Sequence, residues 1–172
     1  MVILSDQVLP STLINNFSKE YYLKLPPSFY KEAKSYLSYK ELKKIQKAYT
    51  FAFYSHDGQL RQDGSKYLTH PVKVAQRLLD LRMDPDTICA ALMHDVLEDC
   101  DVNKQNLTKL FGHDVAEIVD GVSKLGKLDI TPKKENDANN LQKMMLAMSK
   151  DVRVILVKIC DRLHNMLSLI HI

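Results

Sequence analysis

The segment His94-Asp95-Val96-Leu97-Glu98-Asp99 carries the side chains best suited to chemistry, and it directly follows a run of apolar residues. If its helix continues through Asp99, one imidazole and three carboxylates fall within an arc of about 140°, at ~100° per residue. Carboxylates packed together repel one another and lose hydration unless a cation neutralises them. The segment therefore predicts a metal site with catalytic carboxylates beside it. The alternative is a helix end whose acids face water.

Two polar residues elsewhere in the chain extend this candidate ligand set. His70 precedes Pro71, which suits the first turn of a helix. Asp161 follows an apolar run, residues 154–160, where an isolated buried carboxylate would be costly. Together with His94 and Asp95 they form a set of two imidazoles and two carboxylates, which suits a divalent transition-metal ion. The order His…His-Asp…Asp is typical of HD-type phosphohydrolases.

The same His-Asp dipeptide occurs at His56 and at His113. His56 stands at an expected helix end beside a glycine, and His113 follows Phe111-Gly112 at an expected helix start. Neither dipeptide is embedded in an apolar helix as His94 is. We therefore expect both histidines to be surface or capping residues.

Helical periodicity dominates the chain and predicts the elements that position these residues. Ser38 and Glu41 have the spacing of a capping box, and Asp84 with Pro85 marks another helix start. The β-branched run 153–159 could form a strand, but no second strand is available to pair with it, so we expect a buried helix. The expected helices cover residues 11–19, 28–37, 38–56, 70–83, 84–99, 135–149 and 153–167. We also expect a short helix that runs through Leu107 and Leu110 and ends at Gly112, and another marked by apolar residues between 115 and 122.

Composition bounds the class of protein. The 172 residues, 45% hydrophobic and 26% charged, suit one soluble globular domain. The net charge of +3 permits an anionic ligand. It does not require nucleic acid as a partner, because the sequence has no dense stripe of Lys and Arg. No apolar run approaches the ~18 residues of a membrane span. The scattered residues Cys89, Cys100 and Cys160 predict free thiols in a reducing compartment, so we expect a cytoplasmic protein without a membrane partner.

Four separated motifs then resemble one enzyme family. They are Arg61-Gln-Asp-Gly-Ser-Lys-Tyr-Leu-Thr-His-Pro71, Ala90-Ala-Leu-Met-His-Asp-Val-Leu-Glu-Asp99, Gly121-Val-Ser-Lys-Leu125 and Asp161-Arg-Leu-His-Asn-Met166. In this order they resemble the N-terminal hydrolase domain of the RelA/SpoT homologues, the alarmone enzymes. The resemblance implies an all-α HD-domain fold. We expect a lead-in segment over residues 1–25 and the HD hydrolase domain over residues 26–172.

The resemblance also implies an activity and roles for residues. The family's domain binds manganese and removes the 3′-pyrophosphate of guanosine tetra- and pentaphosphate. The implied metal ligands are the four residues already chosen, and Glu98 and Asp99 match the catalytic acidic pair. Arg61 and Asn165 match positions that contact the nucleotide, the arginine near the guanine base. Lys66 and Lys158 could add positive charge for the phosphates, and Ser168 stands where the family usually has a threonine.

Some positions depart from the family. Gln62 stands where a lysine is common, and Leu167 where an arginine is usual. The tail 167–172 no longer follows the family, so we expect an HD domain that is incomplete at its C-terminus. We also expect the synthetase and regulatory domains of the longer enzymes to be missing. Two alternatives stay open, namely an HD phosphohydrolase for another nucleotide and a non-catalytic fragment that binds the alarmone or regulates a synthetase domain.

Overall fold

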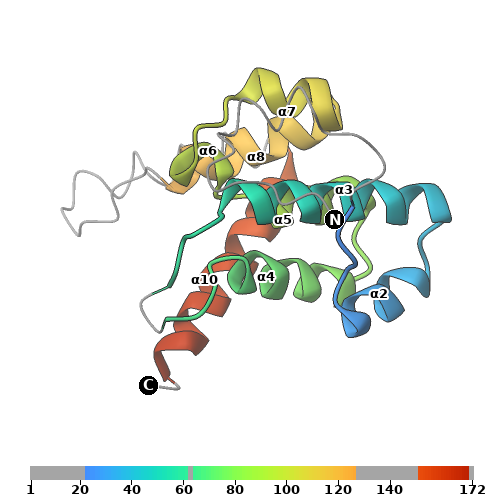
Figure 1. The fold of residues 1–172 in the computed structure, drawn as a ribbon, viewed down its shortest axis with the longest axis horizontal. Coiled ribbons are helices and arrows are strands. Elements are labelled where there is room, and N and C mark those ends of the chain that lie inside the picture. The colour runs from blue at the N-terminus through green and yellow to red at the C-terminus, as the bar shows by residue number, and fades with distance from the viewer. Residues whose placement is uncertain (1–21, 62–63, 127–150, 171–172) are drawn as a thin grey trace, which may run out of the picture.

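The computed structural model describes residues 22–61, 64–126 and 151–170, and within these ranges every regular element is a helix (Figure 1). An isolated bridge joins Leu60 to Lys66 in the loop before α4. The expected all-α fold is therefore confirmed. The helices are α2 (Pro27–Lys34), α3 (Tyr39–Ser55), α4 (Thr69–Asp80), α5 (Pro85–Leu92), α6 (Val96–Asp99), α7 (Lys104–Phe111), α8 (His113–Gly126) and α10 (Val152–Ile170).

Helix α5 is the centre of the packing. It contacts α3, α4, α8 and α10, and the last of these crosses behind α4 and α5 in Figure 1. Residues 87–92 of α5 are all fully buried, because the helix is apolar on every side. The segment that leads into the candidate site is thus anchored in the core.

Local signals fix the starts of α3 and α5 as predicted. The Ser38 side chain accepts a hydrogen bond from the Glu41 N–H while the Glu41 carboxylate accepts one from the Ser38 N–H, so the capping box is confirmed. The Asp84 carboxylate caps α5 by accepting from the N–H groups of Asp86 and Thr87. Such caps satisfy N–H groups that the helix itself leaves without partners.

The prediction for one helix was wrong. The predicted single helix 84–99 is interrupted after Leu92, and α6 begins only at Val96. In the interruption the N–H of Met93 donates to the Ala90 carbonyl, and the N–H of Val96 donates to the Met93 carbonyl. These bonds span three residues instead of four and tighten the chain like a 3₁₀ turn. The tight turn falls on His94 and Asp95, the residues of the His-Asp motif.

The helix predicted over 153–167 instead of a strand is confirmed as α10. It approaches α8 closely, since a methyl group on Gly121 would come within 2.8 Å of Val154 Cγ2. The expected lead-in helix 11–19, the expected helix 135–149 and Gln62 lie outside the described residues.

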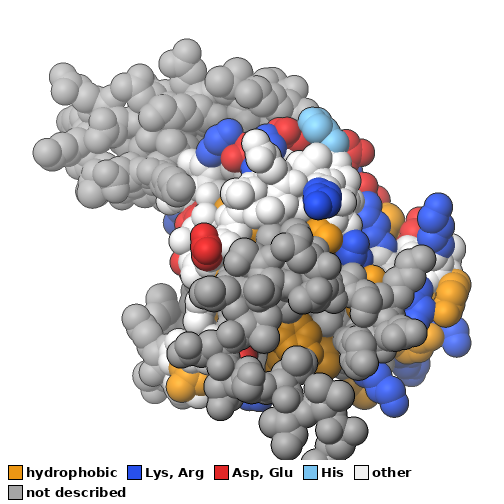
Figure 2. Space-filling view, turned by 45° about the horizontal axis from the view of Figure 1, so that its top comes forward, with side chains coloured by type: hydrophobic (Ala, Val, Ile, Leu, Met, Phe, Trp, Pro, Cys, Tyr) orange, Lys and Arg blue, Asp and Glu red, His pale blue; other side chains and the backbone are white. Residues whose placement is uncertain are grey.

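On the face shown in Figure 2, Lys and Arg side chains are scattered over the described part of the surface. Among the described residues, no helix has the length and apolar character needed to cross a membrane.

Candidate functional site

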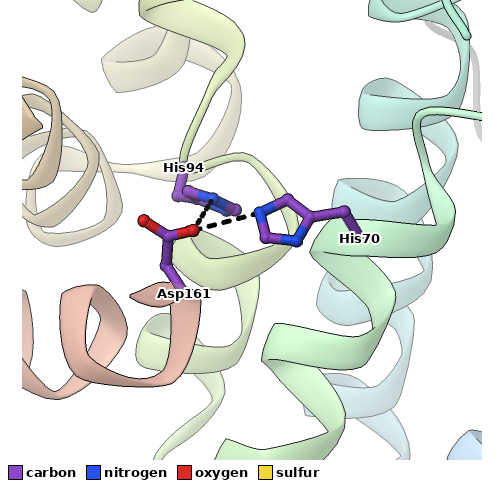
Figure 3. A group of neighbouring side chains, drawn as sticks. All are labelled: His70, His94 and Asp161. Carbon is purple, nitrogen blue, oxygen red and sulfur yellow. Dashed lines mark ion pairs between the residues drawn. The ribbon is translucent and has the colours of Figure 1, made fainter. Parts of the chain in front are cut away.

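Three buried side chains from distant parts of the chain meet at one point. His70 lies in the first turn of α4, His94 lies in the turn after α5, and Asp161 lies on α10 (Figure 3). Each offers one ligand atom, and these atoms all lie within 4.8 Å of one another. His70 Nε2 lies 3.1 Å from Asp161 Oδ1, and His94 Nε2 lies 3.8 Å from the same oxygen. Two imidazoles and a carboxylate at this spacing can hold a divalent cation.

The His94 ring is set up as a metal ligand. The side chain is fully buried, and its Nδ1 lies 2.8 Å from the Ala91 carbonyl oxygen. Because a carbonyl only accepts, the proton must sit on Nδ1, which leaves Nε2 to face the other site residues. Nε2 is one of the few buried side-chain atoms in the described ranges without a hydrogen bond of standard geometry. A buried nitrogen of this kind fits a bound cation.

Asp95 borders this group of three. Its Oδ1 lies 3.1 Å from His94 Nε2, and its Oδ2 lies 3.9 Å from His70 Nε2. Burial raises the pKa of the Asp95 carboxyl, but His94 and the Tyr67 hydroxyl outweigh burial and lower that pKa to about 2. Asp95 is therefore a carboxylate at neutral pH. The structure thus brings all four predicted ligands together, and their roles as ligands stay predictions.

His70 is oriented by a second histidine. Its Nδ1 lies 2.9 Å from His164 Nδ1, so one of the two nitrogens donates and the other accepts. If Nε2 of His70 binds a cation, Nδ1 of His70 carries the proton and His164 is the acceptor. Burial, the charge of His70 and then Arg61 lower the pKa of His164 to about 4, which keeps its ring neutral and able to accept. Partners of this kind fix the orientation of a ligating ring.

Asp161 is neutralised on both sides. Its Oδ1 faces the two histidines, while Lys158 Nζ lies 2.9 Å from its Oδ2. Although burial raises the pKa of Asp161, its contacts with His70, His94 and Lys158 lower that pKa well below its usual range. Lys158 was predicted to bind substrate, and the structure places its ammonium group against a predicted metal ligand.

The predicted catalytic acids occupy different places beside this group. Asp99 is exposed, and its Oδ2 lies 2.7 Å from the Tyr67 hydroxyl, which also lies 2.8 Å from Asp95 Oδ2. Glu98 is exposed on another side, near Lys158 and the end of α8. A methyl group on Gly126 would come within 2.9 Å of Glu98 Oε1 and 3.4 Å of Lys158 Nζ.

The structure brings two of the predicted nucleotide-binding residues, Arg61 and Asn165, next to the candidate metal centre. The Arg61 guanidinium donates to Asn165 Oδ1 at 3.4 Å, and Asn165 Nδ2 donates to Asp161 Oδ1 at 2.8 Å. These two residues therefore extend from the candidate metal centre to the surface. Ser168 lies half-buried one turn after His164 on α10, and Lys66 lies exposed in the loop before α4.

Sequence reasoning assigned no role to Tyr67 or His164, although both lie inside the quoted motifs. The one available signal was spacing, because each stands three residues from a predicted ligand, His70 or Asp161. His56 caps the C-terminus of α3 as expected but is buried, with 4% of its surface exposed, and it stacks on Tyr67. His113 lies on the surface as expected.

Comparison with known proteins places this site in a family. Residues 48–171 of this chain match the family model of the HD domain. The guanosine-3′,5′-bis(diphosphate) 3′-pyrophosphohydrolase of Vibrio cholerae is 49% identical over 137 residues, which are 80% of this chain and 19% of that protein. The bifunctional (p)ppGpp synthase/hydrolase SpoT of Escherichia coli K12 is 48% identical over 135 residues, 78% of this chain and 19% of that protein.

A solved structure is also similar. It is described as "A metazoan ortholog of SpoT hydrolyzes ppGpp and plays a role in starvation responses", and it matches with a TM-score of 0.60 and 27% identity. The match covers 78% of this chain and 72% of that one. By contrast, this chain spans only 19% of the length of each of the two curated relatives named above. The predicted resemblance to the RelA/SpoT homologues is confirmed, and the chain belongs to the HD-domain family.

Proposed function

We propose that this chain hydrolyses guanosine 3′,5′-bis(diphosphate), or its pentaphosphate form, at the ribose 3′ position with manganese as cofactor. The oxygen of water bonds to the phosphorus next to the ribose, and the bond from that phosphorus to the 3′-oxygen breaks. The 3′-oxygen takes up a proton, which leaves GDP or GTP and releases pyrophosphate. The observation that carries the proposal is the placement of Asp99 beside a group of two histidines and a carboxylate that can hold a cation. The names of the relatives point to the same substrate.

Charge explains why this site needs a cation. The leaving pyrophosphate is anionic, and so are Asp95, Glu98, Asp99 and Asp161 around it. His70, His94, Asp95 and Asp161 would hold the manganese ion. A divalent cation supplies Lewis-acid polarisation of a phosphoryl oxygen and of the attacking water.

The remaining residues handle protons and the nucleotide. Asp99 or Glu98 would orient the water, accept its proton or return a proton to the 3′-oxygen. Arg61 and Asn165 would contact the nucleotide at the outer end of the chain of hydrogen bonds from Asp161. Lys158 would balance the charge of Asp161 and of the phosphates, with Lys66 and Ser168 at the edge of the site.

The test is turnover of labelled guanosine 3′,5′-bis(diphosphate) with and without manganese. We expect pyrophosphate release only with the metal. Glu98→Gln and Asp99→Asn should each lose most turnover while keeping manganese affinity, because they handle protons and are not ligands. Asp114→Asn is the matched control, since Asp114 is an exposed acid in the His113 dipeptide.

Other outcomes point to other functions. Loss of manganese affinity in Asp99→Asn as severe as in His94→Ala would make Asp99 a ligand. Binding of the nucleotide without release of pyrophosphate would overturn the proposal in favour of a regulatory module. Turnover of other nucleotides alone would indicate a different HD phosphohydrolase.

A further inference from the structure

We propose that Tyr67 is a positioning residue that holds Asp95 and Asp99 together, so that the first can face the metal and the second the reacting atoms. This inference rests on the proposed function and adds a residue to it. Tyr67 lies in the loop directly before α4, three residues before His70.

The hydroxyl of Tyr67 joins the two acids directly. Its oxygen lies 2.8 Å from Asp95 Oδ2 and 2.7 Å from Asp99 Oδ2. A phenol carries a single proton, so it donates to one carboxylate at a time while both remain within reach of it. Asp95 is the N-cap of α6 and Asp99 is its last residue, and the hydroxyl bridges the ends of their side chains.

The Tyr67 ring is itself held in place. It stacks on His56 with 4.4 Å between ring centroids and 21° between planes. His56 is buried, and its Nδ1 lies 2.8 Å from Gln59 Oε1. Gln59 also connects the backbones, since its Nε2 donates to the Asp99 carbonyl at 3.1 Å and its own carbonyl accepts from the Tyr67 N–H at 3.1 Å. The side chains of Asp95, Asp99 and Tyr67 are therefore held by one connected set of contacts that runs through His56 and Gln59.

The phenol acts as a donor and not as a base. Its oxygen lies within hydrogen-bond distance of two carboxylates, and a carboxylate only accepts, so the hydroxyl keeps its proton and donates it. Its effect on the reaction must therefore pass through Asp99 and Asp95. Positioning of this kind matters, because a displacement of ~1 Å at a reacting centre can cost about 100-fold in rate.

Tyr67→Phe removes the hydroxyl and keeps the ring that stacks on His56. At saturating manganese we expect kcat to fall by about tenfold or more while KM changes little, because Asp99 acts on the reacting atoms and not on nucleotide binding. Tyr36→Phe is the matched control. Its hydroxyl donates to the Met83 carbonyl at 2.8 Å, at the opposite end of α4 from His70, so turnover should be unchanged.

A second readout does not depend on turnover. Loss of a partner that orients a ligand typically lowers metal affinity or activity by ~10–100-fold. Manganese affinity of Tyr67→Phe, measured by calorimetry, should therefore fall about tenfold through Asp95. In an Asp99→Asn background, Tyr67→Phe should still lower manganese affinity but should add little to the loss of single-turnover rate.

The two proposals fail in distinguishable ways. If the wild-type chain releases no pyrophosphate, the proposed function fails, and the manganese affinity of Tyr67→Phe still tests the positioning of Asp95. If the wild-type chain is active and Tyr67→Phe matches it in both kcat and manganese affinity, the inference about Tyr67 is overturned. A lower melting temperature as the sole change would likewise overturn it, since the role would be structural.

Discussion

A single imidazole nitrogen decides how the candidate metal centre responds to protons. His94 is fully buried, its Nδ1 is engaged by the Ala91 carbonyl, and its Nε2 lies 3.1 Å from Asp95 Oδ1. Burial favours the neutral ring, but Asp95 and Asp161 outweigh burial and raise the pKa of His94 to about 10. A proton and a divalent cation therefore compete for Nε2.

We predict that manganese affinity rises with pH between about pH 6.5 and 8.5, approaching tenfold per pH unit for one displaced proton. The sign follows from the raised pKa of His94. Below that pKa the metal-free site holds a proton that the cation must displace, and a higher pH makes that proton easier to remove. Calorimetry in buffers of different ionisation enthalpy should detect close to one proton released per ion. An affinity independent of pH, with no proton release, would contradict this.

At the scale of elements, α8 meets its neighbours closely at two glycines with different surroundings. Beside Gly121 stands the packed side chain of Val154 on α10, whose Cγ2 would lie 2.8 Å from an added methyl group. Beside Gly126 stand the carboxylate of Glu98 and the ammonium group of Lys158. A methyl group at the first position presses on the core, and one at the second presses on the candidate site.

We predict that Gly126→Ala lowers turnover by about tenfold or more with little change in melting temperature, because the methyl group displaces Glu98 and not the core. Gly121→Ala is the matched control. Crowding of Val154 should destabilise the fold by ~1–3 kcal/mol, as overpacked cores do. Turnover assays and thermal unfolding of both variants test this. If Gly126→Ala turns over substrate as fast as the wild type, the reaction does not depend on the position of the Glu98 carboxylate.

For the whole molecule, the candidate metal centre links elements far apart in sequence. His70 at the start of α4 and Asp161 on α10 meet only because α4 and α10 pack against each other. The unfolded chain has no such site. A cation that binds the group of three therefore binds the folded state in preference to the unfolded one.

We predict that manganese raises the melting temperature. A ligand at 100 times its Kd stabilises the folded state by ~2.7 kcal/mol. For a domain of this size that corresponds to roughly 5–11 °C. Thermal unfolding with and without manganese measures the shift, and Asp161→Asn should abolish most of it. A melting temperature that stays constant while calorimetry shows bound manganese would exclude this linkage.

Sequence patterns predicted most of the helices, the starts of α3 and α5, and the residues worth testing. Helices depend on contacts within a few residues, so apolar spacing and the caps at Ser38 and Asp84 predicted α2 to α4, the start of α5, and α7, α8 and α10. The motifs that carry His70, His94 and Asp161 could likewise be read directly. The division at residue 26 and the helices expected in 11–19 and 135–149 stay predictions.

How these residues are used depends on contacts between elements far apart in the chain. At the interruption after Leu92, the buried ring of His94 takes the Ala91 carbonyl as its hydrogen-bond partner. Apolar periodicity cannot predict that a side chain competes with the backbone for this carbonyl. Tyr67 reaches Asp95 and Asp99 across 28 and 32 residues, and His164 reaches His70 across 94. Contacts over such separations are set by the packing of α4, α5 and α10 against one another, because no local spacing rule relates residues so far apart.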